Sequence, residues 1–195
     1  GGRSMEIILV EENQEALEEL ARHIREDQPQ AVIHTFPDRE ALERWLEEDR
    51  PARLRVQTFG NFELFVDGTP VAFKYSRTKE IVALLVNNRG AQTTNGEIIA
   101  TLWEDDGDPA RKASYLSNLR QDLQNTLMSL NLNGIILKQR GSMAIAADRI
   151  DCDLYDWLAK KDKSRYRYMG DYMNQYSWAE FMAAELDEIS YSFDG

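Results

Sequence analysis

The chain has 195 residues, enough for one or two domains that each bury a core of their own. Its single cysteine, Cys152, excludes an intrachain disulfide framework and a thiolate metal cluster, and two histidines argue against a His-rich zinc site. We see no secretory signal and no apolar run near the roughly 20 residues of a membrane span, so a cytoplasmic protein is expected.

The net charge of −11 argues against nucleic-acid binding only if it is spread evenly. Residues 1–50 carry a net charge of −8, residues 51–150 carry +2, and residues 151–195 carry −5. The middle segment alone has a basic excess, which permits DNA binding there.

The first segment, residues 5–50, alternates predicted strands and helices in the order βαβα. Glu6–Val10 is a continuous apolar run after one acid, typical of a strand buried on both faces. An amphipathic helix, a second strand over residues 31–36 and a second helix from Pro37-Asp38 follow. Asp49-Arg50-Pro51 marks the boundary of the segment.

The second segment, residues 54–150, begins with a small antiparallel sheet. Its strands are predicted at residues 55–59 and 62–66 and, after a turn at Asp67-Gly68, at residues 70–73.

Three helices and a hairpin are predicted next. The first helix ends at Arg89-Gly90, Asn95 caps the second, and Pro109 opens the third after an acidic turn. A hairpin covers residues 135–145. The core stripe of the third helix comprises Leu116, Leu119, Leu123 and Leu127.

The last segment, residues 151–195, returns to helix after Asp151-Cys152-Asp153 and closes with a helix over residues 179–189. Its aromatic residues favour a short helical tail that caps the preceding domain, with a partner-docking surface as the alternative. These aromatics are Tyr166, Tyr168, Tyr172, Tyr176 and Trp178.

Six short motifs follow one another between residues 54 and 158: Thr58-Phe59-Gly60-Asn61-Phe62, Val66-Asp67-Gly68, Thr78-Lys79-Glu80, Leu102-Trp103, Tyr115-Leu116-Ser117-Asn118-Leu119-Arg120 and Asp151-Cys152-Asp153-Leu154-Tyr155. Together they resemble the OmpR-type winged helix, in the version found in bacterial regulators that carry a transcriptional activator domain. The resemblance implies a helix-turn-helix whose last helix enters the major groove of DNA.

The third helix has the composition for this role. With Leu116 and Leu123 against the core, its opposite face holds amides and hydroxyls and no acid. The expected contacts are Asn118, Ser114 and Gln121 at bases with Ser117 beside them, Arg111, Lys112 and Tyr115 at phosphates, and Lys138 and Arg140 in the wing. The alternative is a solvated polar face. Arg120 points nearer the core, where an ion pair with Glu104 or Asp105 is expected.

Residues 5–48 are similar to the opening of a response-regulator receiver, through Ile7–Glu12, Ala16-Leu17, Thr35-Phe36 and Glu40–Leu42. In receivers an acid pair after the first strand helps to hold magnesium, which makes Glu11 and Glu12 weak metal candidates. A solvated loop is the favoured interpretation of this pair. The third strand with its phosphoacceptor aspartate is absent, so one chain should not accept a phosphoryl group.

Gly170-Asp171-Tyr172 and Tyr176-Ser177-Trp178-Ala179-Glu180 resemble the start of the helical activator domain that follows such winged helices. The helical array that continues this domain is missing from the sequence, which favours the helical cap.

The sequence therefore predicts an α/β half-receiver (βαβα, residues 5–50), an α+β winged helix-turn-helix domain (54–150) and a short helical tail (151–195). We expect a sequence-specific regulator of transcription that binds duplex DNA, with no enzymatic activity, cofactor or resident metal. A homodimer through residues 5–48 is expected, because the apolar first strand has only one neighbour. RNA polymerase is a further candidate partner.

Two alternatives remain open. The acidic ends favour a protein-interaction module whose winged helix does not bind DNA, and a phosphorylation-dependent regulator is a weaker option. The outer face of the third helix distinguishes the first alternative from DNA binding, because a DNA-reading face is polar and free of acids.

Overall fold

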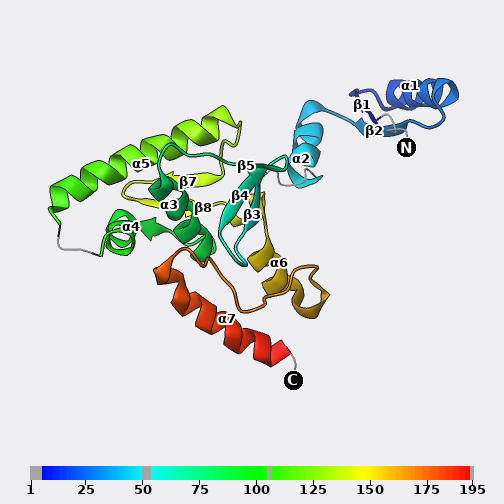
Figure 1. The fold of residues 1–195 in the computed structure, drawn as a ribbon. Coiled ribbons are helices and arrows are strands. Elements are labelled where there is room, and N and C mark those ends of the chain that lie inside the picture. The colour runs from blue at the N-terminus through cyan, green and yellow to red at the C-terminus, as the bar shows by residue number, and fades with distance from the viewer. Residues whose placement is uncertain (1–5, 50–53, 105–106, 194–195) are drawn as a thin grey trace. The chain divides into compact units, whose positions relative to one another are not determined.

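The chain folds into two compact units, residues 1–51 and 52–195, in a computed structural model that describes residues 6–49, 54–104 and 107–193 (Figure 1). The predicted boundary at Asp49-Arg50-Pro51 lies largely outside the described residues. No helix in these three ranges is long and apolar enough to cross a membrane.

The first unit consists of β1 (Glu6–Val10), α1 (Gln14–Asp27), β2 (Val32–Phe36) and α2 (Arg39–Asp49). This is the βαβα order that the hydrophobic spacing predicts. The two strands pair in parallel along their whole length. A parallel pair needs a crossover connection, and α1 supplies it.

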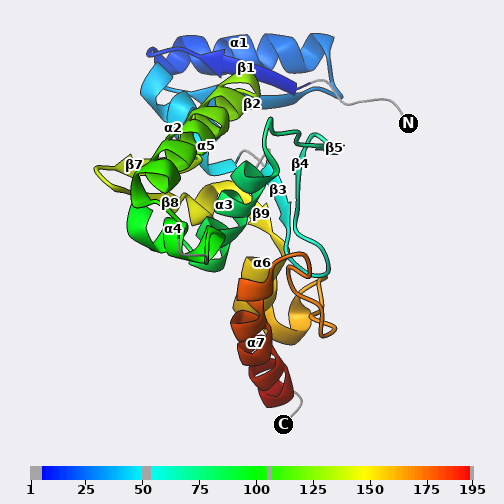
Figure 2. The ribbon, with the colours of Figure 1, turned by 60° about the vertical axis from the view of Figure 1, so that its left-hand side comes forward.

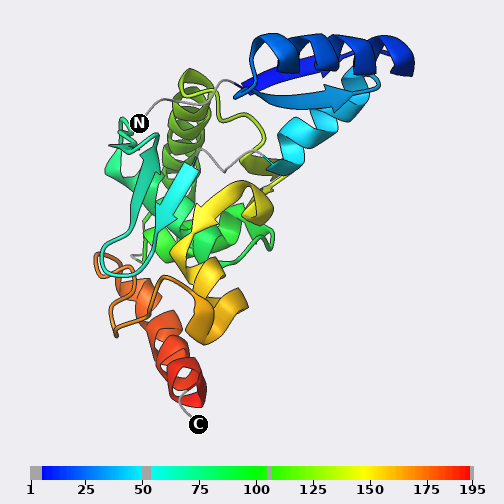
Figure 3. The ribbon, with the colours of Figure 1, turned by 90° about the vertical axis from the view of Figure 1, so that its right-hand side faces the viewer.

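The helices of this unit lie on opposite faces of the two-stranded sheet (Figure 3). Leu17 and Ala21 are the buried residues of α1. On the other face, Trp45 of α2 lies over β2, with its ring centroid 4.7 Å from that of His34 and 5.2 Å from that of Phe36. Each helix therefore gives the sheet one apolar contact surface.

β1 is not buried on both faces, contrary to the prediction. Ile8 and Val10 are 44% and 42% exposed, whereas Ile7 and Leu9 on the opposite face are partly buried. The difference arises because α2 covers β2 rather than β1. Among the described residues, β1 also has β2 as its only strand partner, so one of its edges is unpaired.

The second unit begins with a sheet of four strands in the order β5-β4-β3-β9. They are β3 (Leu54–Gln57), β4 (Glu63–Val66), β5 (Thr69–Pro70) and β9 (Ile150–Cys152). β3 to β5 form an antiparallel meander, and β9 lies parallel to β3. β9 is not predicted from the sequence, because its three residues are too few to show a strand period.

The predicted turn at Asp67-Gly68 is present between β4 and β5. Both residues have positive φ, 50° and 80°, as a two-residue hairpin loop requires. The strand predicted over residues 70–73 is shorter than expected and ends at Pro70. Val71 still donates its backbone N–H to the Leu64 carbonyl at 2.8 Å, after which the chain leaves the sheet.

Three helices and a hairpin follow, as predicted. The helices are α3 (Ser76–Asn87), α4 (Asn95–Leu102) and α5 (Pro109–Ser129), and the hairpin is β7 (Ile136–Gln139) with β8 (Ser142–Ile145). Leu116, Leu119 and Leu123 of α5 are buried in one core with α3 and α4, and Leu127 is partly buried. This confirms the predicted stripe.

The start of α4 differs from the prediction. Thr94 rather than Asn95 caps the helix, and its Oγ1 accepts from the Glu97 backbone N–H at 3.1 Å. Asn95 is the first residue of the helix, so its side chain does not cap α4 and can bond to another element. Thr94 also belongs to β6 (Thr93–Thr94), which pairs with β8 and thereby joins the hairpin to the start of α4.

The tail adds α6 (Asp153–Lys160) and α7 (Glu180–Phe193), which lie side by side at one end of the unit (Figure 2). The Trp157 and Phe193 ring centroids are 5.0 Å apart. Between the helices, the Met173 N–H donates to the Thr58 carbonyl at 2.8 Å. The tail therefore packs onto the sheet as the predicted cap.

Candidate nucleic-acid interface

The outer face of α5 is the central feature of the site. Asp108 caps the helix, accepting from the Ala110 N–H at 3.0 Å, and Pro109 occupies the first turn. Because the leucine stripe faces the core, the opposite side carries exposed Ser114, Asn118 and Gln121. These are the three residues that the sequence assigns to base contacts.

The exposed charges of this region are all positive. Residues 109–146, which span α5 and the hairpin β7–β8, hold five basic residues and one acid, Asp122. Asp122 is only 8% exposed, so the outer surface of these elements presents cations and no carboxylate. The five basic residues are Arg111, Lys112, Arg120, Lys138 and Arg140.

The residues expected at phosphates lie near the start of α5. Arg111 is exposed, and Tyr115 is 49% exposed with its ring centroid 6.4 Å from that of Trp103. Lys112 is only partly exposed, and its Nζ lies 3.5 Å from the Trp103 carbonyl oxygen as a donor. Tyr115 and Lys112 thus both lie beside Trp103.

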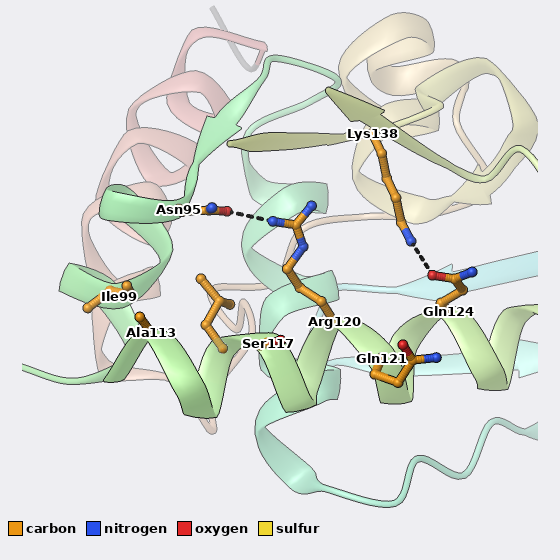
Figure 4. Close-up of a pocket in the computed structure, with 9 residues that line it drawn as sticks. Asn95, Ile99, Ala113, Ser117, Arg120, Gln121, Gln124 and Lys138 are labelled. Atoms are coloured by element: carbon orange, nitrogen blue, oxygen red, sulfur yellow. Dashed lines mark hydrogen bonds between the residues drawn. The ribbon is translucent and has the colours of Figure 1, made fainter. Parts of the chain in front are cut away.

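A groove of about 350 Å³ runs along one flank of α5, between this helix, the start of α4 and the hairpin (Figure 4). It brings together Ser117, Gln121 and Lys138, which are predicted site residues from two elements. The other six predicted site residues do not line it; they are Arg111, Lys112, Ser114, Tyr115, Asn118 and Arg140. The full lining is Asn95, Ile99, Ala113, Leu116, Ser117, Arg120, Gln121, Gln124 and Lys138.

Two hydrogen bonds cross this groove. Arg120 Nη1 donates to Asn95 Oδ1 at 3.1 Å, and Lys138 Nζ donates to Gln124 Oε1 at 3.0 Å (Figure 4). The first bond joins α5 to α4, and the second joins α5 to the hairpin. Both cations are therefore held beside the face that carries Gln121.

Arg120 does not have the partner that the sequence suggests. The described residues show no ion pair between Arg120 and Glu104, and Asp105 lies outside them. Arg120 instead pairs with Asn95 because it projects from the flank of α5 that faces α4.

Sequence reasoning missed Asn95, Arg120 and Gln124 as members of the groove. Residues 117, 120, 121 and 124 follow helical i, i+3 and i+4 spacing, which is the signal that could have identified this flank. The position of Asn95 depends on tertiary packing and has no such local signal.

Asp122 is held inside the unit by donors from α3 and from the residues before it. Its carboxylate accepts from the backbone N–H groups of Lys74 and Tyr75 at 3.2 and 3.1 Å, and from Thr78 Oγ1 at 2.6 Å. Burial raises the pKa of this carboxyl, but the hydrogen bonds from Thr78, Tyr75 and Lys74 outweigh burial and leave the pKa below its usual value.

Other chemistry has little support here. Cys152 is buried, and burial raises the pKa of its thiol to about 12, so it is not a nucleophile near neutral pH. Glu11 and Glu12 are exposed, and Glu11 Oε1 accepts from the Asn13 N–H at 3.0 Å. Within the described ranges, no group of three or more His, Cys, Asp or Glu side chains is placed to hold a metal ion.

Comparison with solved structures shows a shared fold. EmbR of Mycobacterium tuberculosis, solved in complex with a low-affinity phosphopeptide, aligns over 73% of this chain and 44% of its own, with 19% identity and a TM-score of 0.59. The chain thus spans less than half of EmbR. At this identity the likeness shows only that the two chains share a mixed α/β fold over the aligned part.

A second structure is similar at a lower level. The response regulator DrrB of Thermotoga maritima, an OmpR/PhoB homologue, aligns over 73% of this chain and 99% of its own, with 15% identity and a TM-score of 0.33. An alignment this loose supports no inference. No protein-family model and no curated protein matches the sequence.

The lowered pKa of Asp122 predicts a pH-dependent contribution to stability. A depressed carboxyl pKa stabilises the fold above the unfolded pKa of about 3.9, and this stability is lost as the pH falls through the folded pKa. At neutral pH, Asp122→Asn should lower the free energy of unfolding by about 1–3 kcal/mol. The difference from the wild type should begin to shrink below about pH 4, where the unfolded chain takes up the proton, and should vanish only below the folded pKa.

Urea unfolding at pH values between 7 and 3 measures this difference. Tryptophan fluorescence is a suitable signal, because Trp103, Trp157 and Trp178 lie in the same unit as Asp122. A difference that stays constant across this range would contradict the prediction.

Proposed function

We propose that this protein binds duplex DNA sequence-specifically through α5 and the hairpin β7–β8, and thereby controls transcription. One observation carries the proposal: the five cations of residues 109–146 have no exposed acid among them, although the whole chain has a net charge of −11. Phosphate contacts supply most of the affinity of such complexes, and a carboxylate on the same surface would oppose them.

The roles of the residues follow from their positions. Ser114, Asn118 and Gln121 occupy the exposed side of a helix of the size that the major groove admits, and amides can donate and accept at base edges. Arg111, Lys112 and Tyr115 at the start of α5 would contact phosphates, with Ser117 beside the base-reading residues. Lys138 and Arg140 would reach the backbone or the minor groove from the hairpin.

A protein-interaction module is the second candidate, and the acidic first unit is what favours it. The eleven acidic residues from Glu6 to Glu43 are all exposed, so they leave a strongly negative surface. The acid-free outer face of α5 favours DNA binding, because exposed carboxylates there would repel the phosphates of a duplex. RNA polymerase is the further partner that a transcription regulator implies.

Under this proposal, the first unit (residues 5–50) is a truncated receiver. One chain alone would then not accept a phosphoryl group. In the part of this unit that the structure describes, Glu11 and Glu12 follow β1, and there is no third strand that could carry an acceptor aspartate. Regulation would then come from assembly rather than from phosphate. The winged-helix domain (54–150) and the tail (151–195) complete the proposed organisation.

Assembly through β1 is the form we propose for a homodimer. Two strands alone are marginal in water, and the exposed Ile8 and Val10 lie next to the unpaired edge of β1. Antiparallel pairing of two β1 strands would give four strands with two helices on each face. Because α2 lies over β2, Ile8 and Val10 of the two copies would meet each other between the two α2 helices and shield one another from water.

Two substitutions test DNA binding. Asn118→Ala should cost roughly 1–3 kcal/mol on a specific site, because a base contact is lost. Lys138→Ala should weaken all duplexes about equally and reduce the salt dependence, because it removes a phosphate contact. Fluorescence anisotropy on a site selected from a random duplex pool measures both effects. Failure of the wild type to bind any duplex at low salt would refute the function.

The absence of a phosphoryl acceptor is tested by intact mass. Incubation with Mg²⁺ and a small phosphodonor should leave the mass of the chain unchanged. A stable added phosphate that disappears when Glu11 or Glu12 is substituted would overturn the prediction.

A charged substitution on β1 tests the homodimer. Sedimentation equilibrium at micromolar concentration should show a wild-type dimer and an Ile8→Lys monomer, because a buried lysine in the joined sheet would be unpaired. Leu20→Lys is the control, since Leu20 is comparably exposed, at 47%, but lies on α1. A wild-type monomer, or a dimer that persists in Ile8→Lys, would contradict the proposed interface.

A further inference from the structure

Helix α3 receives its N-terminal cap from another helix. Its N-cap residue, Tyr75, makes no side-chain capping bond. The backbone N–H groups of Lys74 and Tyr75, just before the first helical residue, donate instead to Asp122 of α5, which also accepts from Thr78 Oγ1. Helix starts need such acceptors, and a carboxylate there is favoured by the helix dipole.

These bonds constrain α5 in a way that its apolar contacts do not. The leucine stripe holds α5 against the core, but burial is non-directional and tolerates small rotations of a helix about its axis. Hydrogen bonds to a carboxylate are directional, and both oxygens of Asp122 are engaged. A rotation of α5 would therefore break the bonds to α3.

We propose that Asp122 is a positioning residue for DNA reading: its hydrogen bonds to the start of α3 fix the rotation of α5 and so aim Asn118 and Gln121 at the bases. The inference rests on the proposed DNA-binding function. Asp122 follows Gln121 directly and lies one turn after Asn118, so any rotation that moves its carboxylate moves both amides.

The chemistry of the site requires a carboxylate. An asparagine has one acceptor oxygen, and its amide NH₂ would face a backbone N–H of residue 74 or 75. Thr78 is fully buried, so its hydroxyl has no alternative contact with bulk solvent. Thr78→Val keeps the shape of this side chain and removes the donor, whereas Thr78→Ser keeps the donor.

Asp153 provides a matched control in the same unit. It is also a buried carboxylate at 6% exposure, and it accepts from Thr58 Oγ1 and from the N–H groups of Thr58 and Phe59. These bonds join α6 to the sheet and do not involve α5. Asp153→Asn should therefore lower the free energy of unfolding without changing the orientation of the outer face of α5, which carries Asn118 and Gln121.

The experiment compares full-length variants on two duplexes: one selected from a random pool by the wild type, and a scrambled duplex of the same composition. Anisotropy titrations below the unfolding midpoint of every variant give the ratio of the two affinities. Asp122→Asn should lower this ratio about tenfold, the equivalent of one misplaced base contact. Asp153→Asn should leave the ratio unchanged, and the affinity for the scrambled duplex should stay constant in both.

The outcomes separate this inference from the function on which it rests. A wild type that selects no duplex refutes both. A wild type that binds, with an unchanged ratio in Asp122→Asn or an equal loss in Asp153→Asn, refutes the positioning role alone. If Asp122→Asn does not fold, the Thr78 variants decide: Thr78→Val should lower the ratio and Thr78→Ser should preserve it, and equal ratios would overturn the inference.

Discussion

The carboxylate of Asp122 is the interaction on which the placement of α5 against the start of α3 depends. Burying an ionised group is costly unless hydrogen bonds replace water, and donors from α3 and the residues before it do so here. Burial of Asp122 also changes the charge of the surface. It removes the one acid of α5 from the outer face of this helix, which the proposed function needs free of negative charge. One side chain thus satisfies the start of α3 and leaves the outer face of α5 cationic and polar.

The same use of a buried carboxylate recurs at the other end of the unit. Asp153 accepts from Thr58 and Phe59, where the sheet, α6 and the tail meet. The tail adds aromatic packing at this junction, with the Phe59 ring 5.9 Å from Trp157 and 5.7 Å from Tyr168 between centroids. The tail is therefore part of the core of this unit rather than an appendage, and Trp157 and Tyr168 are occupied by that packing.

The sequence predicted those elements that carry a clear period or turn signal. The leucines of α5 repeat at helical spacing, and Asp67-Gly68 has the positive φ angles of a hairpin turn. Contacts between distant segments had no such signal. The pairing of β9 with β3, the Arg120–Asn95 bond and the cap that Asp122 gives α3 all join residues far apart in the chain. For the same reason, the candidate site was predicted along α5 itself, whereas the flank that faces α4 was missed.

The pairing of β9 with β3 has a consequence for the order in which the unit forms. Thr58 and Asp153, which are hydrogen-bonded beside this strand pair, lie 95 residues apart in the sequence, and closing so long a loop is slow compared with forming helices and hairpins. During synthesis, α3, α4, α5 and the hairpin leave the ribosome before β9 does. The helix that carries the reading face can therefore begin to pack while the sheet behind it still has an open edge, and the last strand to emerge closes the unit.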